Sequence, residues 1–301
     1  MNKVLVIIVT YNGMKWIDRC LGSVYASGMA ADAFVVDNGS TDGTVEHVRE
    51  HFPSAILHCS GENLGFGRAN NIGMRYALDE GYEYVYLLNQ DAWVFPDTFA
   101  RLSEAMSGTD YGVLSPMQMT ASLEKPDPRF AAKCISRCPE LEAYYRTSSG
   151  VYSGKGSDEI VDVPFVMAAH WMISRACLEA VGGFSPAFTH YGEDDNWLHR
   201  AIYHGFMVGF VPGVPAVHDR EMRPMSKASA MRLKCVASVV KVSNPLNFLP
   251  WRLFIQPFEL LGISMFRRSS DVLRHIPGFI RSYPSMIRFR RISRTTPCAF
   301  L

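Results

Sequence analysis

Short apolar runs rich in β-branched residues alternate with helical patterns over the first 115 residues, and this alternation restricts the fold strongly. The predicted strands cover residues 4–9, 33–36, 55–59 and 84–88. The predicted helices cover residues 15–27, 44–51, 67–80 and 96–106. Strands this apolar are buried on both faces, which is typical of a parallel sheet covered by helices. The sequence therefore predicts an α/β fold with a mostly parallel sheet flanked by helices.

The rest of the chain differs in character. Residues 116–160 are rich in Pro, Ser, Gly and Tyr, and we expect a long loop there, beside the site. A structured block follows, with an apolar run at 161–174, a helix from Arg175, a helix over 193–204 and a strand over 207–211. After Arg220 only helical runs remain. We therefore divide the chain at residue 220, with halves 1–115 and 116–220 before it and a helical region, 221–301, after it.

Charge is distributed unevenly between these parts. The whole chain has a net charge of +1, but from Arg220 onward 15 Lys or Arg stand against 3 Asp or Glu. This basic region also interleaves Phe, Trp, Leu, Ile and Met with arginine, as in amphipathic helices of membrane interfaces. Two interpretations stay open, namely contact with the inner face of the cell membrane, or packing on the rest of the chain or in a homo-oligomer. No nucleic-acid-binding module is visible.

Composition excludes several classes of protein. The seven cysteines are scattered and form no C-x-x-C pair, which favours reduced thiols in a cytoplasmic protein. The apolar run at the N-terminus is short and lacks a small-residue cleavage site, so it is a strand rather than a signal peptide. No stretch reaches the ~18 uninterrupted apolar residues of a membrane span. We expect a soluble or peripheral protein.

Polar residues follow the first two predicted strands. Thr10, Tyr11 and Asn12 end the first strand, and Asp37 and Asn38 end the second. Ligands of such sheets bind beyond the carboxyl ends of the strands, where a carboxylate, an amide and an aromatic ring suit a nucleoside. The following residues, 40–44, are better explained as a turn and a helix cap.

A glycine- and asparagine-rich segment follows the third strand. Gly65 begins a G-x-G-x-x-N pattern, which differs from the dinucleotide-binding fingerprint and follows the wrong strand for it. With Asn63, it suits a helix N-terminus whose free N–H groups face a ligand. Asn70 and Asn71 are poor helix formers, which favours a polar role for them in the site.

Asn89, Gln90 and Asp91 end the fourth strand. A carboxylate at a sheet edge can hold a hard divalent cation, although a strand-end turn explains a lone Asp equally well. His218 ends a later apolar segment, and a mixed Asp and His site would suit Mn²⁺ or Mg²⁺. We therefore expect a metal site at Asp91 and His218.

Three consecutive carboxylates begin the predicted helix at residue 193. They could merely stabilise the helix dipole, which is enough to explain Asp195. The glycine-rich, aromatic segment before them is better explained if it presents Glu193 and Asp194 to a cleft. A carboxylate placed there can deprotonate an incoming hydroxyl group.

Taken together, these segments resemble the inverting family 2 glycosyltransferases with a GT-A fold. The matching motifs occur in order over about residues 3–220: Thr10-Tyr11-Asn12, Asp37-Asn38-Gly39-Ser40-Thr41-Asp42-Gly43-Thr44, Asn63-x-Gly65-x4-Asn70-Asn71-x-Gly73, Leu88-Asn89-x-Asp91, Gly183-Phe184 to Tyr191-x-Glu193-Asp194, and Val217-His218. Asn89 and Asn70 depart from the commoner Asp and Arg, as in the rhamnosyl- and galactofuranosyl-transferase-like subgroup.

The resemblance implies roles for these residues. Asp194 would be the catalytic base, with Glu193 beside it, and Asp91 would hold Mn²⁺ or Mg²⁺, with His218 as a second ligand. The nucleotide-binding residues would be Thr10, Tyr11, Asn12, Asp37, Asn38, Asn63, Gly65, Asn70, Asn71 and Gln90. The implied reaction transfers a sugar from a UDP- or dTDP-linked donor to a glycan or lipid-linked acceptor in bacterial surface polysaccharide or glycolipid synthesis.

Two other functions remain as alternatives. A nucleotidyltransferase shares the sheet and the metal, but it would need a glycine-rich phosphate loop with Lys or Arg near the first strand, and Tyr11-Asn12-Gly13 offers none. A catalytically inactive nucleotide-sugar-binding protein is disfavoured because Asp91, Asp194 and His218 are all present.

Overall fold

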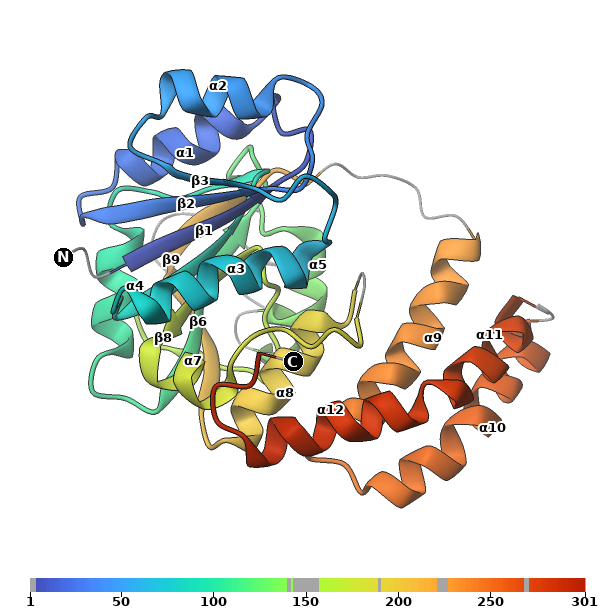
Figure 1. Ribbon diagram of the computed structural model, residues 1–301. Helices are drawn as coiled ribbons and strands as arrows, with labels where there is room; N and C mark the ends of the chain where they lie inside the picture. Colours follow the sequence, from blue (N-terminus) through green and yellow to red (C-terminus); the bar gives the residue numbers. More distant parts are fainter. Residues whose placement is uncertain are drawn as a thin grey trace.

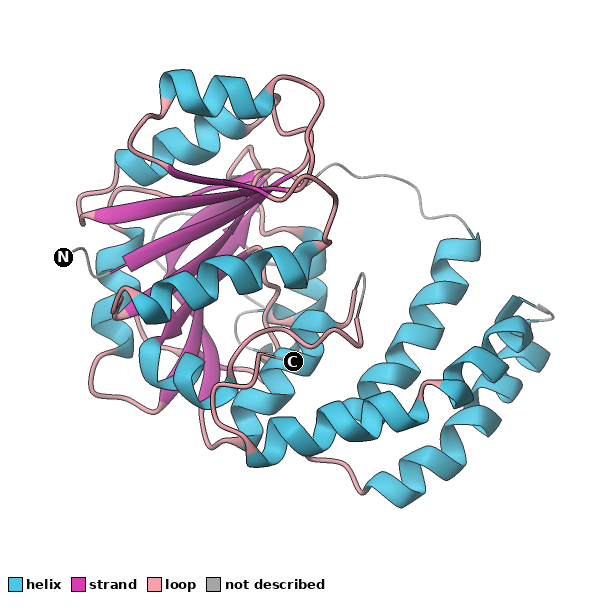
Figure 2. Ribbon diagram, in the orientation of Figure 1, coloured by secondary structure: helices cyan, strands magenta, loops and turns pink. Residues whose placement is uncertain are grey.

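The structure, a computed structural model, describes residues 4–139, 142, 157–188, 191–220, 227–267 and 271–300. Within these residues, one nine-stranded sheet has the order β3-β2-β1-β4-β8-β6-β9-β5, and β7 pairs with β9. Helices cover both faces of the sheet, and a group of C-terminal helices lies to one side of it (Figures 1 and 2). The predicted α/β class with a sheet flanked by helices is confirmed.

The strands from the N-terminal half run parallel, as expected. β1 pairs in parallel with β2 and β4, and β2 with β3. Their bounds are β1 (Val4–Thr10), β2 (Ala31–Asp37), β3 (Ile56–Cys59) and β4 (Tyr84–Asn89). The other strands are β5 (Ala92–Trp93), β6 (Tyr111–Met119), β7 (Val161–Asp162), β8 (His170–Ser174) and β9 (Met207–His218). β8 runs antiparallel to both β4 and β6, so the sheet includes antiparallel pairs, but β6 and β9 run parallel to each other and in the direction of β4.

Side chains alternate along the strands and form two cores, one on each face of the sheet. On β1, Leu5 and Ile7 belong to one core, and Val4, Val6 and Ile8 belong to the other. The first core is covered by α3 (Phe66–Asp79), α7 (Arg175–Val181) and α8 (Glu193–Tyr203). The second is covered by α1 (Ile17–Tyr25), α2 (Thr44–His51) and α4 (Thr98–Met106).

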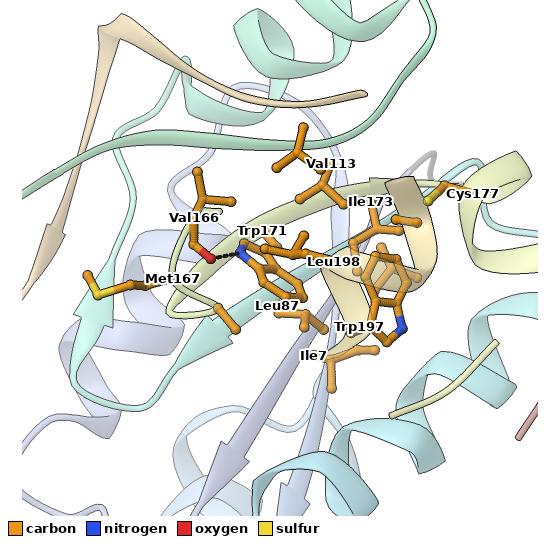
Figure 3. Close-up of a cluster of buried hydrophobic side chains, with 14 of the residues drawn as sticks. Ile7, Leu87, Val113, Val166, Met167, Trp171, Ile173, Cys177, Trp197 and Leu198 are labelled. Atoms are coloured by element: carbon orange, nitrogen blue, oxygen red, sulfur yellow. Dashed lines mark hydrogen bonds between the residues drawn. The ribbon is translucent and has the colours of Figure 1, made fainter. Parts of the chain in front are cut away.

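Figure 3 shows part of the first core, in which two tryptophans meet. The rings of Trp171 on β8 and Trp197 on α8 have centroids 5.6 Å apart, and both side chains are fully buried. Trp171 Nε1 donates to the Val166 carbonyl at 3.3 Å, and Trp197 Nε1 donates to the Gly182 carbonyl at 2.9 Å. A buried indole needs such a partner, so these bonds fix both rings. The core thereby anchors α8, whose first turn carries the predicted catalytic carboxylates.

Helix α3 approaches β1 closely because residue 73 is a glycine. A Cβ at Gly73 would lie 2.8 Å from three side-chain carbons of Ile7. Any larger residue would have to push the helix away from the strand. Gly73 thus sets the distance between α3 and the sheet.

The region 116–160, expected to be a long loop, contains regular structure. β6 extends to Met119, and α5 (Pro128–Lys133) and the 3-10 helix η1 (Ile135–Arg137) follow it. Residues 140–141 and 143–156 lie outside the described residues. Asp127 caps α5 by accepting hydrogen bonds from two backbone N–H groups. The expectation was wrong here because a six-residue helix is too short to show a helical hydrophobic period.

Strand β9 is longer than the predicted strand at 207–211 and ends at His218. It includes Pro212 and Pro215, although proline donates no hydrogen bond to a neighbouring strand. The register between β6 and β9 shifts just there, between the pairs of Pro116 and Met117, which accommodates the prolines. His218 is the last residue of β9, a strand that lies between β6 and β5 in the sheet.

The C-terminal region is helical, as expected. It comprises α9 (Lys227–Ser243), α10 (Leu249–Arg267), α11 (Asp271–Arg281) and α12 (Tyr283–Thr295). These helices share a small core that includes Val242, Leu260, Phe279 and Met286, and α9 and α12 also contact α8. In the described parts of the chain, no helix combines the length and apolar character needed to cross a membrane.

Candidate active site

The carboxyl ends of β1, β2 and β4 meet at one edge of the sheet. Thr10 pairs with Asp37 across β1 and β2, and Val9 pairs with Asn89 across β1 and β4. This register brings three of the predicted polar segments, 10–12, 37–38 and 89–91, to the place where open α/β sheets bind ligands.

Gln90 joins two of these strand ends. Its Oε1 accepts hydrogen bonds from Thr10 Oγ1 at 2.9 Å and from the Tyr11 N–H at 2.8 Å, and its Nε2 donates to the Tyr11 carbonyl at 3.3 Å. Both the oxygen and the nitrogen of the Gln90 amide are thus hydrogen-bonded to the protein. Gln90 and the buried Thr10 therefore hold the ends of β1 and β4 together beneath the site. The ring of Tyr11 is 49% exposed, so it can stack on a flat ligand ring.

Asp37 is nearly inaccessible, with 2% of its surface exposed. Its Oδ2 accepts from the N–H groups of Gly39 and Ser40, each at 3.0 Å, while its buried Oδ1 has no hydrogen-bond partner in the described part of the chain. A buried carboxylate oxygen without a donor is costly unless a ligand supplies an N–H or O–H group. Among the predicted nucleoside contacts, Asp37 therefore has the clearest structural support.

Asn12 organises the loop that follows β2. Its backbone has a φ of 51°, a left-handed conformation that asparagine tolerates. Its Oδ1 accepts from the Thr41 N–H at 2.9 Å, and its own N–H donates to Ser40 Oγ at 2.9 Å. Asp42 Oδ1 in turn accepts from the Thr44 N–H at 3.1 Å. Residues 40–44 form the expected turn before α2, but the expected helix cap is not formed, because Gly43 takes the N-cap position and no side chain caps the helix there.

Asn38, Asn63 and Gly65 hold the entry to α3 beside the strand ends. Asn38 Oδ1 accepts from the Leu64 N–H at 3.4 Å, and its Nδ2 donates to the Gly65 carbonyl at 3.5 Å. Asn63 Oδ1 accepts from the Gly65 N–H at 2.9 Å, and Gly65 has a φ of 79°. These contacts place the N-terminus of α3 next to Asn38.

Asn70 and Asn71, which we expected to contact the nucleotide, are held by the protein itself. The buried Asn70 donates from Nδ2 to the Phe66 carbonyl at 2.9 Å. Asn71 donates from Nδ2 to the Phe184 carbonyl at 3.0 Å and accepts from the Phe184 N–H through Oδ1 at 2.6 Å. The geometry gives Asn71 a structural role, in which it ties α3 to the segment leading to α8.

This role can be tested by replacing Asn71 with alanine. The change leaves the N–H and carbonyl of Phe184 without partners, so we expect a loss of about 1–3 kcal/mol in unfolding free energy. Nucleotide affinity should change less than about threefold, because no ligand contact is lost. Urea unfolding and calorimetric titration measure the two quantities. A large loss of nucleotide affinity in Asn71→Ala, with an unchanged free energy of unfolding, would show that Asn71 binds the nucleotide after all.

Asp91 and His218 lie together, as expected. His218 Nε2 is 3.5 Å from Asp91 Oδ1, and the pairing of β5 with β9 places Ala92 opposite His218. Burial alone would raise the pKa of Asp91, but the hydrogen bond and charge of His218, helped by Arg220, outweigh burial and lower it. Asp91 is therefore ionised at neutral pH and suited to a cation.

The donor set at this point fits a divalent metal. A carboxylate oxygen and an imidazole nitrogen together suit Mn²⁺ or Mg²⁺. Within the described ranges, no three or more His, Cys, Asp or Glu side chains are arranged so that they could hold a metal ion together. A cation held by Asp91 and His218 would therefore take its remaining ligands from a bound diphosphate and water.

The first turn of α8 presents Asp194 to the same region. Burial, followed by the charges of Asp195 and Glu193, raises the pKa of Asp194 to about 7, against smaller opposing effects of the hydrogen bond from the Asp195 N–H and of the Lys133 charge. Burial likewise raises the pKa of Glu193, whose Oε2 is buried without a partner in the described chain. Asp194 can thus accept and release a proton near neutral pH.

A cleft of about 660 Å³ connects Asp194 with His218, while Asp91, the partner of His218, lies outside its lining. Asp194 and Glu193 line it together with His218 and Asn89, whereas Asp37 lies outside its lining, at the strand ends. One wall comes from the C-terminal helix α9, through Leu233, Lys234, Val236, Ala237 and Val240. A Cβ at Gly192 would lie 2.7 Å from Val236 Cγ1, so α9 packs closely against the residues before Asp194. The C-terminal region therefore belongs to the site.

Four basic residues line this cleft that the sequence analysis did not predict as site residues: Arg129, Lys133, Arg220 and Lys234. Arg129 and Lys133 are four residues apart, so one helix face carries both. Arg220 Nη2 lies 3.3 Å from His218 Nδ1, and its Nε donates to Asp127 Oδ2 at 3.3 Å. The position of Arg220, two residues after His218, was a signal available in the sequence.

Comparison with known proteins identifies the family. Residues 5–180, more than half of the chain, match the family model described as glycosyl transferase family 2. The chain belongs to this family and is a glycosyltransferase.

Three relatives illustrate the similarity. The chain is 23% identical to the dTDP-rhamnosyl transferase RfbF of Shigella flexneri, over 72% of this chain and 69% of that protein. It is 27% identical to the low-salt glycan biosynthesis hexosyltransferase Agl10 of Haloferax volcanii, over 71% and 66%. It is 25% identical to the N-acetylglucosaminyl-diphospho-decaprenol L-rhamnosyltransferase of Mycobacterium tuberculosis, over 71% and 75%. The chain thus spans about two thirds of the first two relatives, and the predicted similarity to rhamnosyltransferases is confirmed.

Solved structures show the same fold at low identity. TarS of S. aureus in complex with UDP-GlcNAc has a TM-score of 0.58 and 15% identity, covering 97% of this chain and 88% of that one. The mannosyltransferase PcManGT of Pyrobaculum calidifontis, in complex with GDP-Man and Mn²⁺, has a TM-score of 0.53 and 19% identity, covering 97% and 85%. The predicted GT-A fold is confirmed.

Proposed function

We propose that this glycosyltransferase moves a sugar, with inversion at its anomeric carbon, from a nucleotide-diphosphate sugar to a hydroxyl group of a glycan or lipid-linked acceptor. The observation that carries the proposal is one cleft lined by both Asp194, with its raised pKa, and His218 of the Asp91–His218 pair. The names of the relatives and the ligands of the fold neighbours support a UDP- or dTDP-linked donor used in surface polysaccharide or glycolipid synthesis.

The nucleoside would lie across the strand ends. The unpartnered Oδ1 of Asp37 can accept from a base N–H or a ribose hydroxyl, and the exposed ring of Tyr11 can stack on the base. Asn12, Asn38 and Asn63 hold the surrounding loops through the bonds described above. The diphosphate would then extend toward Asp91.

A divalent metal at Asp91 and His218 would neutralise negative charge on the departing diphosphate. Arg220 beside His218 adds a fixed positive charge at the same place. Arg129, Lys133 and Lys234 line the same cleft as Asp194, where they can attract an anionic acceptor.

Asp194 acts on the acceptor. Its carboxylate takes the hydroxyl proton as the acceptor oxygen bonds to the anomeric carbon, and the bond from that carbon to the diphosphate oxygen breaks. Attack opposite the leaving group inverts the configuration. Glu193 is placed to contact a sugar through its buried, unpartnered Oε2.

The pKa of Asp194 predicts the pH dependence of the reaction. The base must be deprotonated to act, and burial with the charges of Asp195 and Glu193 raises its pKa to about 7. We expect kcat/KM to be constant well above pH 7 and to fall as the pH drops below 7, approaching about tenfold per pH unit. Initial rates at constant ionic strength test this, and a profile that stays flat down to pH 5 would contradict it.

The binding part of the proposal is tested by thermal unfolding with a panel of nucleotide sugars, with and without Mn²⁺. A donor should raise Tm, and Mn²⁺ should increase the shift, because a cation held by Asp91 and His218 would add to the attraction for the diphosphate. Asp37→Ala should remove most of the donor-dependent shift. If no nucleotide sugar changes Tm with or without Mn²⁺, the proposal fails.

A further inference from the structure

Helix α10 is apolar on two opposite faces. Leu260 is fully buried in the C-terminal core, and Leu249, Leu253 and Ile263 pack against that core. The opposite face is exposed. It carries Trp251 (56% exposed), Phe254 (63%), Phe258 (56%), Leu261 (41%) and Met265 (72%), which we call the α10 stripe. A helix at the surface of a domain normally has a polar outer face, so the stripe indicates a contact with something apolar.

The stripe is continuous along one side of the helix. Its members are spaced by three or four residues, which places them in line. The ring centroids of Trp251 and Phe254 are 6.4 Å apart, and those of Phe254 and Phe258 are 5.4 Å apart. At the two ends, Phe248 and Phe266 are 73% and 87% exposed.

No charged side chain interrupts the stripe. Between residues 251 and 266, the charged residues are Arg252 and Glu259. Glu259 is paired with Lys241 at 2.5 Å and with Arg252 at 3.7 Å, and none of these residues belongs to the stripe. The outer face of α10 can therefore leave water without burying an unpaired charge.

The C-terminal helices, to which the stripe belongs, are strongly basic. Residues 227–300 include 13 Lys or Arg and only 2 Asp or Glu. Arg274 and Arg281 on α11 and Arg288 and Arg291 on α12 are exposed. A row of Trp and Phe within a basic region matches the chemistry of an anionic bilayer surface, where rings enter the acyl boundary and arginines meet phosphate groups.

We infer that the α10 stripe docks this protein on the surface of an anionic lipid bilayer. α10 lies on the outer side of the C-terminal helices, and α9 lies nearer to the sheet (Figure 1). Since α9 contacts α10 and also lines the cleft, docking would hold the cleft at the membrane surface. Docking itself does not depend on the proposed function; only the further step, that it brings the cleft to a lipid-linked acceptor, rests on that function.

Vesicle sedimentation with the full chain tests the inference. The wild type should bind vesicles of phosphatidylcholine that contain phosphatidylglycerol, and bind pure phosphatidylcholine vesicles less well. The double variant Trp251→Ser and Phe258→Ser should lose about tenfold or more in vesicle partition. The matched control, Tyr25→Ser and Met207→Ser, replaces two exposed apolar residues outside the C-terminal helices and should bind as the wild type does.

Further measurements separate this inference from catalysis and from self-association. Release of nucleotide from a soluble donor without vesicles should be unchanged in Trp251→Ser with Phe258→Ser, and vesicle binding should be unchanged in Asp194→Asn. Equal vesicle binding by the stripe variant and the wild type would overturn the inference, as would absence of wild-type binding. A wild-type dimer in light scattering that the stripe variant dissociates would also overturn it, by showing a second copy as the occupant.

Discussion

Replacing Asp194 with asparagine is expected to reduce sugar transfer by at least ~10²-fold while donor binding is retained. Asparagine has nearly the same shape, but its amide cannot take the proton of the acceptor hydroxyl. The loss should appear in kcat, because the carboxylate acts in the transition state more than in binding. Steady-state kinetics and calorimetric titration of the donor measure the two effects.

The matched control is Asp195→Asn on the same helix turn. Asp195 raises the pKa of Asp194, so its neutralisation should lower that pKa and shift the acid limb of the pH profile to lower pH, with little loss of rate at pH 8. A rate near that of the wild type in Asp194→Asn would remove Asp194 as the base. Comparable losses in both variants would show that neither carboxylate has the distinct role assigned to Asp194.

Asp91→Ala is expected to lower kcat/KM by at least ~10²-fold and to abolish the increase in donor affinity that Mn²⁺ produces. The reason is that Asp91 supplies the negative charge of the Asp91–His218 pair, and its loss leaves only a neutral imidazole to hold the cation. His218→Ala should have a smaller effect in the same direction, because one carboxylate ligand remains. Donor titrations at several Mn²⁺ concentrations, and activity after removal of metal with a chelator, are the measurements.

Asn89→Ala serves as the control for the metal site. Asn89 lines the cleft at the end of β4, but its amide is a weaker ligand than a carboxylate. We expect its loss to change the Mn²⁺ dependence of donor affinity by less than about tenfold. The metal assignment would be wrong if Asp91→Ala kept the Mn²⁺ response of the wild type, or if Asn89→Ala lost it.

Much of the fold could be predicted because its N-terminal half follows local rules. Short apolar strands separated by helices indicate a parallel sheet, and parallel strands place their carboxyl ends at one edge. Thr10 and Asp37, 27 positions apart in the sequence, are therefore neighbours in the register. The Asp91–His218 pair could be predicted only by combining two weak signals, a carboxylate after one strand and a histidine after a later apolar segment. His218 ends β9, a strand that is longer than the sequence predicted.

The roles of several site residues depend on contacts between distant segments. Asn71 is bonded to the backbone of Phe184, which lies 113 residues later, and Gln90 is bonded to Thr10, 80 residues earlier. An asparagine in a helix indicates that a polar partner exists, but not whether the partner is a ligand or the protein backbone. The basic residues on α5 belong to the site only because the fold carries that short helix to the cleft.

Of the two interpretations of the C-terminal region, the structure shows packing on the rest of the chain, and contact with a membrane stays a proposal. Packing on the rest of the chain is shown by α9, whose Val236 and Val240 line the cleft. The apolar residues of α10 divide between a buried face and an exposed stripe, a division that hydrophobic spacing alone did not reveal because both faces are apolar. Exposure in the folded chain separates the residues that pack from those available to a membrane.

The anomeric configuration of the sugar first released from the cleaved donor tests the central claim most directly. With water as the acceptor, Asp194 would activate the water, and a single displacement would release the sugar with the anomeric configuration opposite to that of the donor. Proton NMR spectra recorded at once after mixing, before mutarotation, distinguish the two anomers. We predict the inverted anomer, at a rate that falls by at least ~10²-fold in Asp194→Asn. Release of the anomer with the configuration of the donor would contradict the single displacement.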